Sequence, residues 1–258
     1  MKASSTQWLV LVLGSFLVCR GSAAEEKADR PGWQLTFDDE FNGSGLDLQK
    51  WTPSDPWGHE RNHELQAYVK DAFDVQEGVL HIQARKQQAF YSGKQRDFTS
   101  GMMTTRGKFS QRYGRFEIRC RVPKGKGMWP AFWLLPDSPQ WPPEIDALEI
   151  LGHEPNKVYL TQHFRDAQGK HGSHGGSWVG PDFSAGFHEF AVEWSPQAIV
   201  WFVDGVERFR SEKDIPDGKM YVLVNLAVGG DWPGAPDEAT QFPADFAVDY
   251  VRVYQRAQ

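Results

Sequence analysis

Three carboxylates fall within six residues of an apolar stretch, PPEIDALEI, which covers residues 142–150. Burying an isolated carboxylate among aliphatic side chains is unfavourable unless it faces a wet cavity or a partner. Strand residues two apart share a face, so Glu144 and Asp146 point the same way. Glu149 joins them only if a β-bulge around 147–148 inserts one extra residue, and such bulges recur beside active sites.

Two carboxyls on one concave face can cleave a glycosidic bond with retention of configuration. One attacks as the nucleophile and the other serves as acid and base, about 5–5.5 Å away. A third carboxylate between them can hold a proton or a hydrogen bond that keeps the pair in opposite protonation states. A solvated acidic strand edge is the simpler interpretation of the acids taken alone, so the flanking sequence has to decide.

The segments around the acids have the pattern of short strands. Apolar and polar residues alternate with period two between Gly, Pro, Asp and Asn, which is typical of an antiparallel sandwich or barrel. Asp204-Gly205, between two alternating runs, predicts a tight hairpin. We predict an all-β fold, with residues 1–24 as a signal peptide, 25–31 as a polar spacer and 32–258 as a single catalytic domain.

The first residues differ in kind from the rest of the chain. Lys2 precedes an apolar run over 8–18, and small residues end at Ala24, so we predict a secretory signal peptide cleaved near Ala24. That run is shorter than the roughly 20 residues of a membrane span, and no later stretch reaches that length. A lipid anchor at Cys19 is the alternative, but Val18 stands where a small residue is expected. We expect a secreted or periplasmic protein.

The net charge limits the classes of binding partner, and the cysteine content limits how the fold can be stabilised. The chain carries a net charge of −6, which disfavours nucleic acid and anionic membranes as partners. After signal cleavage Cys120 is the only cysteine, so no intrachain disulfide forms, and its place in the alternating run FEIRCRV predicts a buried thiol. We expect a monomer that is stabilised by core burial.

Aromatic residues are unusually frequent, with 11 Trp and 17 Phe. A large β core accounts for some of them, because aromatic side chains favour strands. Others are candidates for a carbohydrate cleft, in which flat apolar rings stack on sugar faces. Composition leaves both interpretations open for each tryptophan.

The acid motif and its surroundings resemble glycoside hydrolase family 16. Glu144 to Glu149, E-I-D-A-L-E, is similar to the bulged E-x-D-x-x-E form of its laminarinase-like members. The resemblance covers nearly the whole mature chain, and it implies a β-jelly-roll sandwich of two curved antiparallel sheets with the cleft on the concave face. The other similar stretches, in order, are FDDEFNG (37–43), NHELQAY (62–68), GKGMWPAFWLLP (125–136), VYLTQHF (158–164), HEFAVEW (188–194), LVNLAVGGDWPG (223–234) and VDYVRVYQ (248–255).

Matched position by position, the resemblance implies roles for the three acids. Glu144 matches the nucleophile, Glu149 the acid/base and Asp146 the assisting carboxylate. Trp129 and Trp133 match two tryptophans of a sugar platform, and their spacing of four puts them on one strand face. Packing in the core is the alternative for both tryptophans.

Four further residues match cleft positions more loosely. Asn62 matches an asparagine that hydrogen-bonds sugar hydroxyls, and His163 matches a histidine near the leaving-group side. A structural role is the alternative for His163, although Thr161 alternates with it along the same strand face. Trp141, shortly before the acid motif, and Trp232, in the loop GGDWPG, are further candidates for substrate binding.

Two stretches depart from the family pattern. Many members carry an arginine after T-S-[AG] that reaches the cleft, whereas Met102-Met103 stand there in this chain, so that sugar contact is not carried over. The glycine-rich stretch 169–180 fits no family pattern and is interpreted as a mobile rim of the cleft. His171 and His174 within it are three apart, but no cysteine or acid is spaced to complete a metal site.

Some family members bind a structural calcium ion on the convex face, far from the catalytic residues. The matching positions are Glu40, the backbone carbonyl of Gly78 and Asp249, and oxygen-only ligands suit that ion. An ordinary surface acid pair is the alternative. The resemblance implies no cofactor for catalysis.

The resemblance implies an endo-acting retaining hydrolase whose partner is a polysaccharide substrate. We expect a β-1,3-glucan or a mixed-linkage β-1,3/1,4-glucan, because a sulfated galactan would favour clustered basic residues near the acids. The alternatives are a non-catalytic β-glucan-binding protein on the same scaffold, a transglycosylase, a family 16 hydrolase of another polysaccharide such as a galactan, and an inactive acidic sandwich. The presence of both glutamates favours the enzyme.

Overall fold

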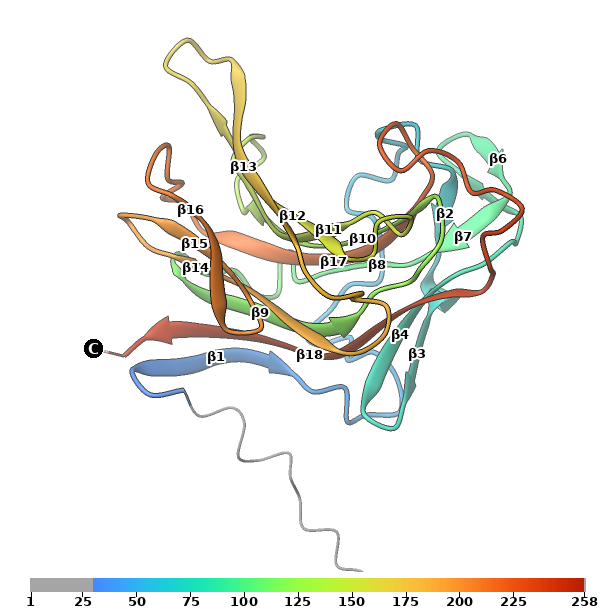
Figure 1. Cartoon of the computed structure of the whole chain (residues 1–258), viewed down its shortest axis with the longest axis horizontal. Helices are drawn as coiled ribbons and strands as arrows, with labels where there is room; N and C mark the ends of the chain where they lie inside the picture. The colour runs from blue at the N-terminus through green and yellow to red at the C-terminus, as the bar shows by residue number, and fades with distance from the viewer. Residues whose placement is uncertain (1–29, 258) are drawn as a thin grey trace, which may run out of the picture.

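The structure, a computed structural model, describes residues 30–257 (Figure 1). The predicted signal peptide over 1–24 and most of the spacer lie outside the described residues. Within 30–257 the chain forms strands and one short 3₁₀ turn, and it has no helix of the length and apolarity that a membrane span needs. The domain boundaries and the monomeric state stay predictions.

Two curved antiparallel sheets lie one above the other, which confirms the predicted all-β jelly-roll sandwich (Figure 1). The larger sheet has the order β16-β15-β14-β9-β18-β4-β3, with β1 paired to β18. Its strands are β1 (Trp33–Asp39), β3 (Phe73–Gln76), β4 (Val79–Ala84), β9 (Gly114–Arg121), β14 (His188–Trp194), β15 (Ile199–Val203), β16 (Val206–Ser211) and β18 (Ala244–Arg256).

The smaller sheet carries the acid motif and has the order β13-β12-β11-β10-β17-β8. Its strands are β8 (Met102–Thr104), β10 (Met128–Pro136), β11 (Glu144–Ile150), β12 (Lys157–Arg165), β13 (His171–Val179) and β17 (Met220–Val228). The remaining elements are a parallel pair, a hairpin and the 3₁₀ turn: β2 (Gln66–Tyr68) with β7 (Phe98–Ser100), β5 (Ala89–Tyr91) with β6 (Lys94–Arg96), and η2 (Lys70–Ala72).

Hydrophobic side chains of both sheets fill the space between them. Ile145, Leu148 and Ile150 of β11 are fully buried, as is Trp201 of the larger sheet. The period-two pattern produces this core because alternate strand residues face the same side. Cys120 is buried in the core as predicted, and burial raises the pKa of its thiol.

The stretch interpreted as a mobile rim of the cleft does line it at His171, but it forms a paired strand where a loop was expected. β13 pairs with β12 over its whole length, from Lys157 with Val179 to Arg165 with His171, and the hairpin rises from the edge of the sheet (Figure 1). Glycine obscures the pattern because it has weak strand propensity. It is needed here because a Cβ at Gly172 would lie 2.6 Å from the ring of Phe164.

The three positions matched to a calcium site adjoin the same stretch of β18. Glu40 follows β1, Gly78 lies in the turn between β3 and β4, and Asp249 lies at a bulge in β18. Both Glu40 oxygens accept hydrogen bonds from Arg252, at 2.6 and 2.7 Å, and Asp249 accepts one from Arg119. Each carboxylate therefore already has a cationic partner, and calcium binding stays a prediction.

Candidate active site

A β-bulge in β11 brings Glu149 to the face that carries Glu144 and Asp146. Opposite β12, Asp146 pairs with Thr161 and Glu149 with Tyr159, so three steps along β11 match two along β12. The pairing with β10 shifts at the same place. All three carboxylates line one cavity, and the predicted bulge is confirmed.

The larger sheet braces this bulge from behind. A bulge disrupts the regular ladder of backbone hydrogen bonds, so its carbonyl groups need other donors. The indole Nε1 of Trp201, on β15, donates to the backbone carbonyl of Asp146 at 2.8 Å. Trp201 is fully buried, so this bond ties the position of the acid to the packing of the core.

We expect Trp201→Phe to destabilise the protein and to lower kcat, because it removes the indole donor from a buried carbonyl at the bulge. The free energy of unfolding should fall by about 1–3 kcal/mol. Thermal melts and kinetics on the same samples check this. The matched control is Trp194→Phe, since Trp194 is also buried but donates to the Pro216 carbonyl at 2.9 Å, away from the bulge. Equal kcat in the two variants would contradict the bracing role.

A cleft of ≈ 1000 Å³ lies along the face that carries the acids. Five tryptophans line it: Trp57, Trp129, Trp133, Trp141 and Trp232. Trp141 and Trp232 are 47% and 39% exposed as whole residues, which leaves their rings open to a ligand. Other tryptophans belong to the core, with Trp51, Trp194 and Trp201 fully buried. The aromatic excess therefore serves both purposes.

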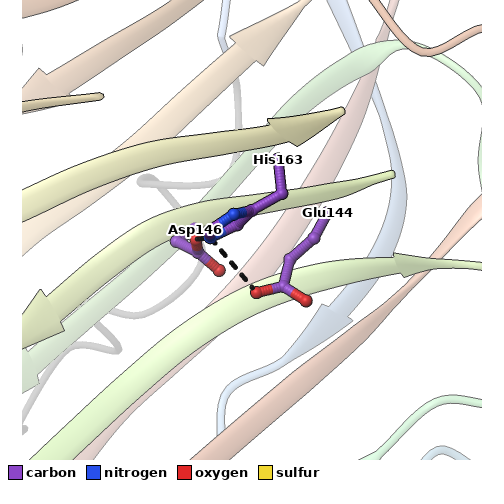
Figure 2. A group of neighbouring side chains, drawn as sticks. All are labelled: Glu144, Asp146 and His163. Atoms are coloured by element: carbon purple, nitrogen blue, oxygen red, sulfur yellow. Dashed lines mark ion pairs between the residues drawn. The ribbon is translucent and has the colours of Figure 1, made fainter. Parts of the chain in front are cut away.

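Glu144 lies among groups that act on its charge in opposite directions. The Trp141 indole donates to Glu144 Oε2 at 2.7 Å, and His163 Nε2 lies 3.7 Å from Glu144 Oε1 (Figure 2). Burial and the nearby Asp146 raise the pKa of Glu144 to about 8, while His163 and the Trp141 hydrogen bond oppose that rise. Two neighbours thus favour the ionised form of this carboxylate.

Asp146 is the most enclosed member of the group. Asp146 is 2% exposed, and its Oδ2 lies 3.2 Å from His163 Nε2 (Figure 2). Among the described residues, that oxygen accepts no hydrogen bond of good geometry. Burial raises the pKa of Asp146, and hydrogen bonding with Glu144 opposes the rise. This residue is placed to exchange a proton or hydrogen bond with Glu144.

The side chains in Figure 2 also form a donor set that a metal ion could use. One ligand atom each from Glu144, Asp146 and His163 lies within 4.8 Å of the others. Carboxylate and imidazole ligands suit divalent transition metals. The His163 imidazole already lies 3.2 Å from Asp146 Oδ2, so the arrangement is explained by acid–imidazole pairing.

Glu149 has an environment that favours its protonated form. Burial, and then the charges of Asp146 and Glu144, raise its pKa well above the usual value, and only the Trp129 indole opposes them. That indole donates to Glu149 Oε1 at 3.1 Å. In contrast to Glu144, no imidazole contact to Glu149 occurs among the described residues. The surroundings of the two glutamates therefore differ: those of Glu149 favour a proton donor, and those of Glu144 include two groups that favour an ionised nucleophile.

The remaining predicted residues lie around the same cavity. Asn62 sits in the loop before β2 with φ 50° and donates to Glu64 Oε1 at 3.4 Å. Trp133 is held by Asn225, whose Oδ1 accepts from the indole at 2.8 Å. Trp232 meets Trp129 edge to face, with ring centroids 5.4 Å apart. The structure thus gathers every substrate-binding residue predicted above into one cleft.

Three cleft residues escaped the sequence analysis. Trp57 stacks on Trp133 with centroids 6.0 Å apart, and the Arg61 guanidinium lies 4.2 Å from the Trp57 ring. His171 lies in the cleft wall beside His163. Trp57 and Arg61 come from a loop without strand periodicity, so no local signal marked them. For His171 the sequence suggests only a metal ligand, because His174 lies three residues away.

Met102 and Met103 stand where many family members carry an arginine, and the structure shows where each of them lies. Met102 lines the cavity that contains the acids, whereas Met103 packs in the core. Arg61 lines the same cavity from another element. Both oxygens of Asp55 accept from Arg61 Nη1 at 3.1 Å, so its charge is balanced.

Comparison with known proteins identifies the family. A β-glucanase of Rhodothermus marinus is 41% identical over 261 residues, covering 91% of this chain and 89% of that protein. The endo-1,3-1,4-beta-glycanase EglC of Rhizobium meliloti is 36% identical over 95% of this chain, which spans only 58% of that relative. The laminarinase catalytic domain of Thermotoga maritima superposes with a TM-score of 0.79 at 38% identity, covering 88% of this chain and 99% of that one. The model of the glycosyl hydrolases family 16 matches residues 62–252, and the chain belongs to that family.

Proposed function

We propose that this protein is an endo-acting, retaining hydrolase of β-1,3-glucan or mixed-linkage β-1,3/1,4-glucan that works outside the cytoplasm. The observation that carries the proposal is the group Glu144, Asp146 and Glu149 on the wall of an open cleft lined by tryptophans. The names of the relatives support the substrate class. The predicted signal peptide supports the location.

In the first step the carboxylate of Glu144 attacks the anomeric carbon. Glu149 donates its proton to the glycosidic oxygen, the bond between that oxygen and the anomeric carbon breaks, and the leaving chain departs with the proton. A covalent glycosyl ester on Glu144 remains. The hydrogen bond from Trp141 and the proximity of His163 suit Glu144 to this task, because both favour the ionised form.

In the second step Glu149, now a carboxylate, accepts a proton from water. The water oxygen attacks the anomeric carbon, the ester bond breaks and Glu144 leaves as a carboxylate. Two displacements at one carbon retain the β configuration. The Trp129 indole can donate to Glu149 in both protonation states, since it is a donor only.

We expect Asp146→Asn to lower kcat by about 10- to 100-fold, the effect of a hydrogen bond to a charged group. The charge of Asp146 raises the pKa of both Glu144 and Glu149, so its removal should lower both values. Both limbs of the pH–activity profile should then move to lower pH. Profiles of kcat against pH for the variant and the wild type check this, and an unchanged profile would contradict the assisting role.

The cleft offers little to a sulfated substrate. Its arginines are Arg61, which is paired with Asp55, and Arg106, whose guanidinium lies 5.9 Å from the Tyr221 ring centroid. Sulfate recognition favours clustered, unpaired guanidinium groups. The walls are instead indole rings, which stack on uncharged sugars, so the structure favours a glucan over a sulfated galactan.

The test is a parallel measurement of kcat/KM on laminarin, mixed-linkage glucan, carrageenan and agarose, with products sized. We expect a clear preference for the glucans and a ladder of oligosaccharides, as endo-cleavage produces. Proton NMR of the first product should show the β anomer. A preference for carrageenan or agarose would overturn the substrate class, an initial α anomer would overturn the mechanism, and products longer than the substrate would indicate transglycosylation.

A further inference from the structure

His171 contacts the catalytic cluster although it lies on the edge strand β13. It pairs in register with Arg165 of β12, and its Nε2 lies 2.9 Å from His163 Nδ1. Its ring centroid is 4.8 Å from that of Trp141, whose indole donates to Glu144. His171 therefore touches both residues that adjust the charge of Glu144.

The distance between the two imidazoles requires one donor and one acceptor. His163 Nε2 faces the oxygens of Glu144 and Asp146. An ionised carboxylate can only accept a hydrogen bond, so this nitrogen carries a proton whenever the acid facing it is ionised. A neutral His163 then accepts at Nδ1 from His171, and a protonated His163 donates at Nδ1 to His171. An imidazole partner can satisfy Nδ1 in either case, because its two tautomers offer a donor or an acceptor.

His171 can play both parts only while it is itself neutral. Burial is the largest cause that lowers the pKa of His171, and the nearby His163 and Arg165 lower it further. The charged groups that face the two imidazoles are Glu144 and Asp146 from β11 and Arg165 from β12. The acids lie on the His163 side and the arginine on the His171 side, and this arrangement disfavours a positive charge on His171.

We propose that His171 is a positioning residue, which holds the His163 ring toward Glu144 and Asp146 through both protonation states of His163. Arg165 fixes the hairpin that carries His171. Its guanidinium donates to the Gly169 carbonyl at 2.7 Å and to the Trp141 carbonyl. This inference rests on the proposed function, because His163 matters for catalysis only if Glu144 is the nucleophile.

The test separates the hydrogen bond of His171 from its packing. His171→Phe keeps a ring beside Trp141 but cannot pair with Nδ1, whereas the amide of His171→Gln can turn to donate or accept. We expect the Phe variant to lower kcat about tenfold with little change in KM, and the Gln variant to recover most of the loss. In the Phe variant the acid limb of the pH profile should move to higher pH, because His163 no longer lowers the pKa of Glu144.

The matched control is the same pair of substitutions at His174. That histidine is also on β13, but it pairs with Asp214 at 2.8 Å and stacks on Phe164 at 4.4 Å, away from the acids. His174→Phe should leave kcat and the pH profile unchanged. The inference is overturned if His171→Phe behaves like His174→Phe, or if His171→Gln is as impaired as His171→Phe.

A second measurement keeps this inference separate from the proposed function. Ring ¹⁵N shifts of His163, recorded by NMR without substrate, report which nitrogen carries the proton. His171→Phe should change the Nδ1 shift, and His174→Phe should not. If the wild type hydrolyses none of the glucans, the proposed function fails while this readout still decides whether His171 holds His163. An unchanged Nδ1 shift in His171→Phe would overturn the inference alone.

Discussion

Glu144→Gln should lower kcat on glucan by about 10⁴-fold or more, because the variant cannot form the glycosyl ester. The amide keeps the shape of the side chain and can still accept from the Trp141 indole, so we expect the fold to be intact. The matched control is Glu154→Gln, since Glu154 lies beyond β11 and pairs with Lys157 at 3.5 Å. Initial rates on laminarin, with far-ultraviolet circular dichroism of both variants, check the expectation.

The same substitution should stabilise the protein, and the gain should depend on pH. The pKa of Glu144 rises from its ordinary 4.5 to about 8 on folding, so the unfolded chain binds fewer protons between those values. Stability therefore falls as pH rises through that window, because unfolding allows the carboxyl to ionise while the native state keeps it protonated. We expect a gain of about 2 kcal/mol at pH 8, roughly 4–8 °C in Tm, and almost none at pH 4. Thermal melts at both pH values measure it.

Azide distinguishes a lost nucleophile from general damage. If Glu144 is the nucleophile, azide can enter the vacated space in Glu144→Gly and attack the anomeric carbon of an activated β-glycoside. One displacement replaces two, so the product should be the α-glycosyl azide, and the rate should rise with azide concentration. A β-glycosyl azide from this variant, or retention of more than about a tenth of wild-type kcat, would remove Glu144 from the nucleophile role.

The sequence predicts the local parts of this site well, because local pattern and local structure share a cause. Period two marks the strands, and Asp204-Gly205 marks a hairpin in which both residues have positive φ, 50° and 74°. The bulge in β11 follows from the spacing of the acids, since Glu149 reaches the cleft only with one extra residue. Each of these inferences needed only a few consecutive residues.

The parts that the sequence does not predict depend on contacts between distant segments. The strand β13 is concealed by glycines that leave room for rings such as Phe164, and glycine alone suggests a loop. Trp57 meets Trp133 across 76 residues of chain, and His171 matters only because of where His163 lies. The arginine partners of Glu40 and Asp249 are also far away in the sequence. The sequence alone therefore does not show that these two carboxylates are already paired.

Glu149→Gln should lower kcat on glucan by about 10³-fold, within the range for loss of a general acid and base. Its pKa is raised by burial and by Asp146 and Glu144, so Glu149 carries the proton that the leaving oxygen needs. A glutamine in its place still accepts from the Trp129 indole but has no proton of suitable acidity. The effect should depend on the leaving group, which separates this role from that of Glu144.

An aryl β-glycoside with an acidic phenol leaves without a proton, so Glu149→Gln should form the glycosyl ester from it at a rate close to wild type. Hydrolysis of that ester then lacks a base, and stopped-flow kinetics should show a burst of phenol followed by a slow steady state. Azide needs no base, so it should speed the steady state and give the β-glycosyl azide. The alkaline limb of the wild-type pH profile reports loss of the Glu149 proton and should be absent in the variant. An equal loss on glucan and on the aryl glycoside, with no burst, would assign Glu149 to substrate binding instead of proton transfer.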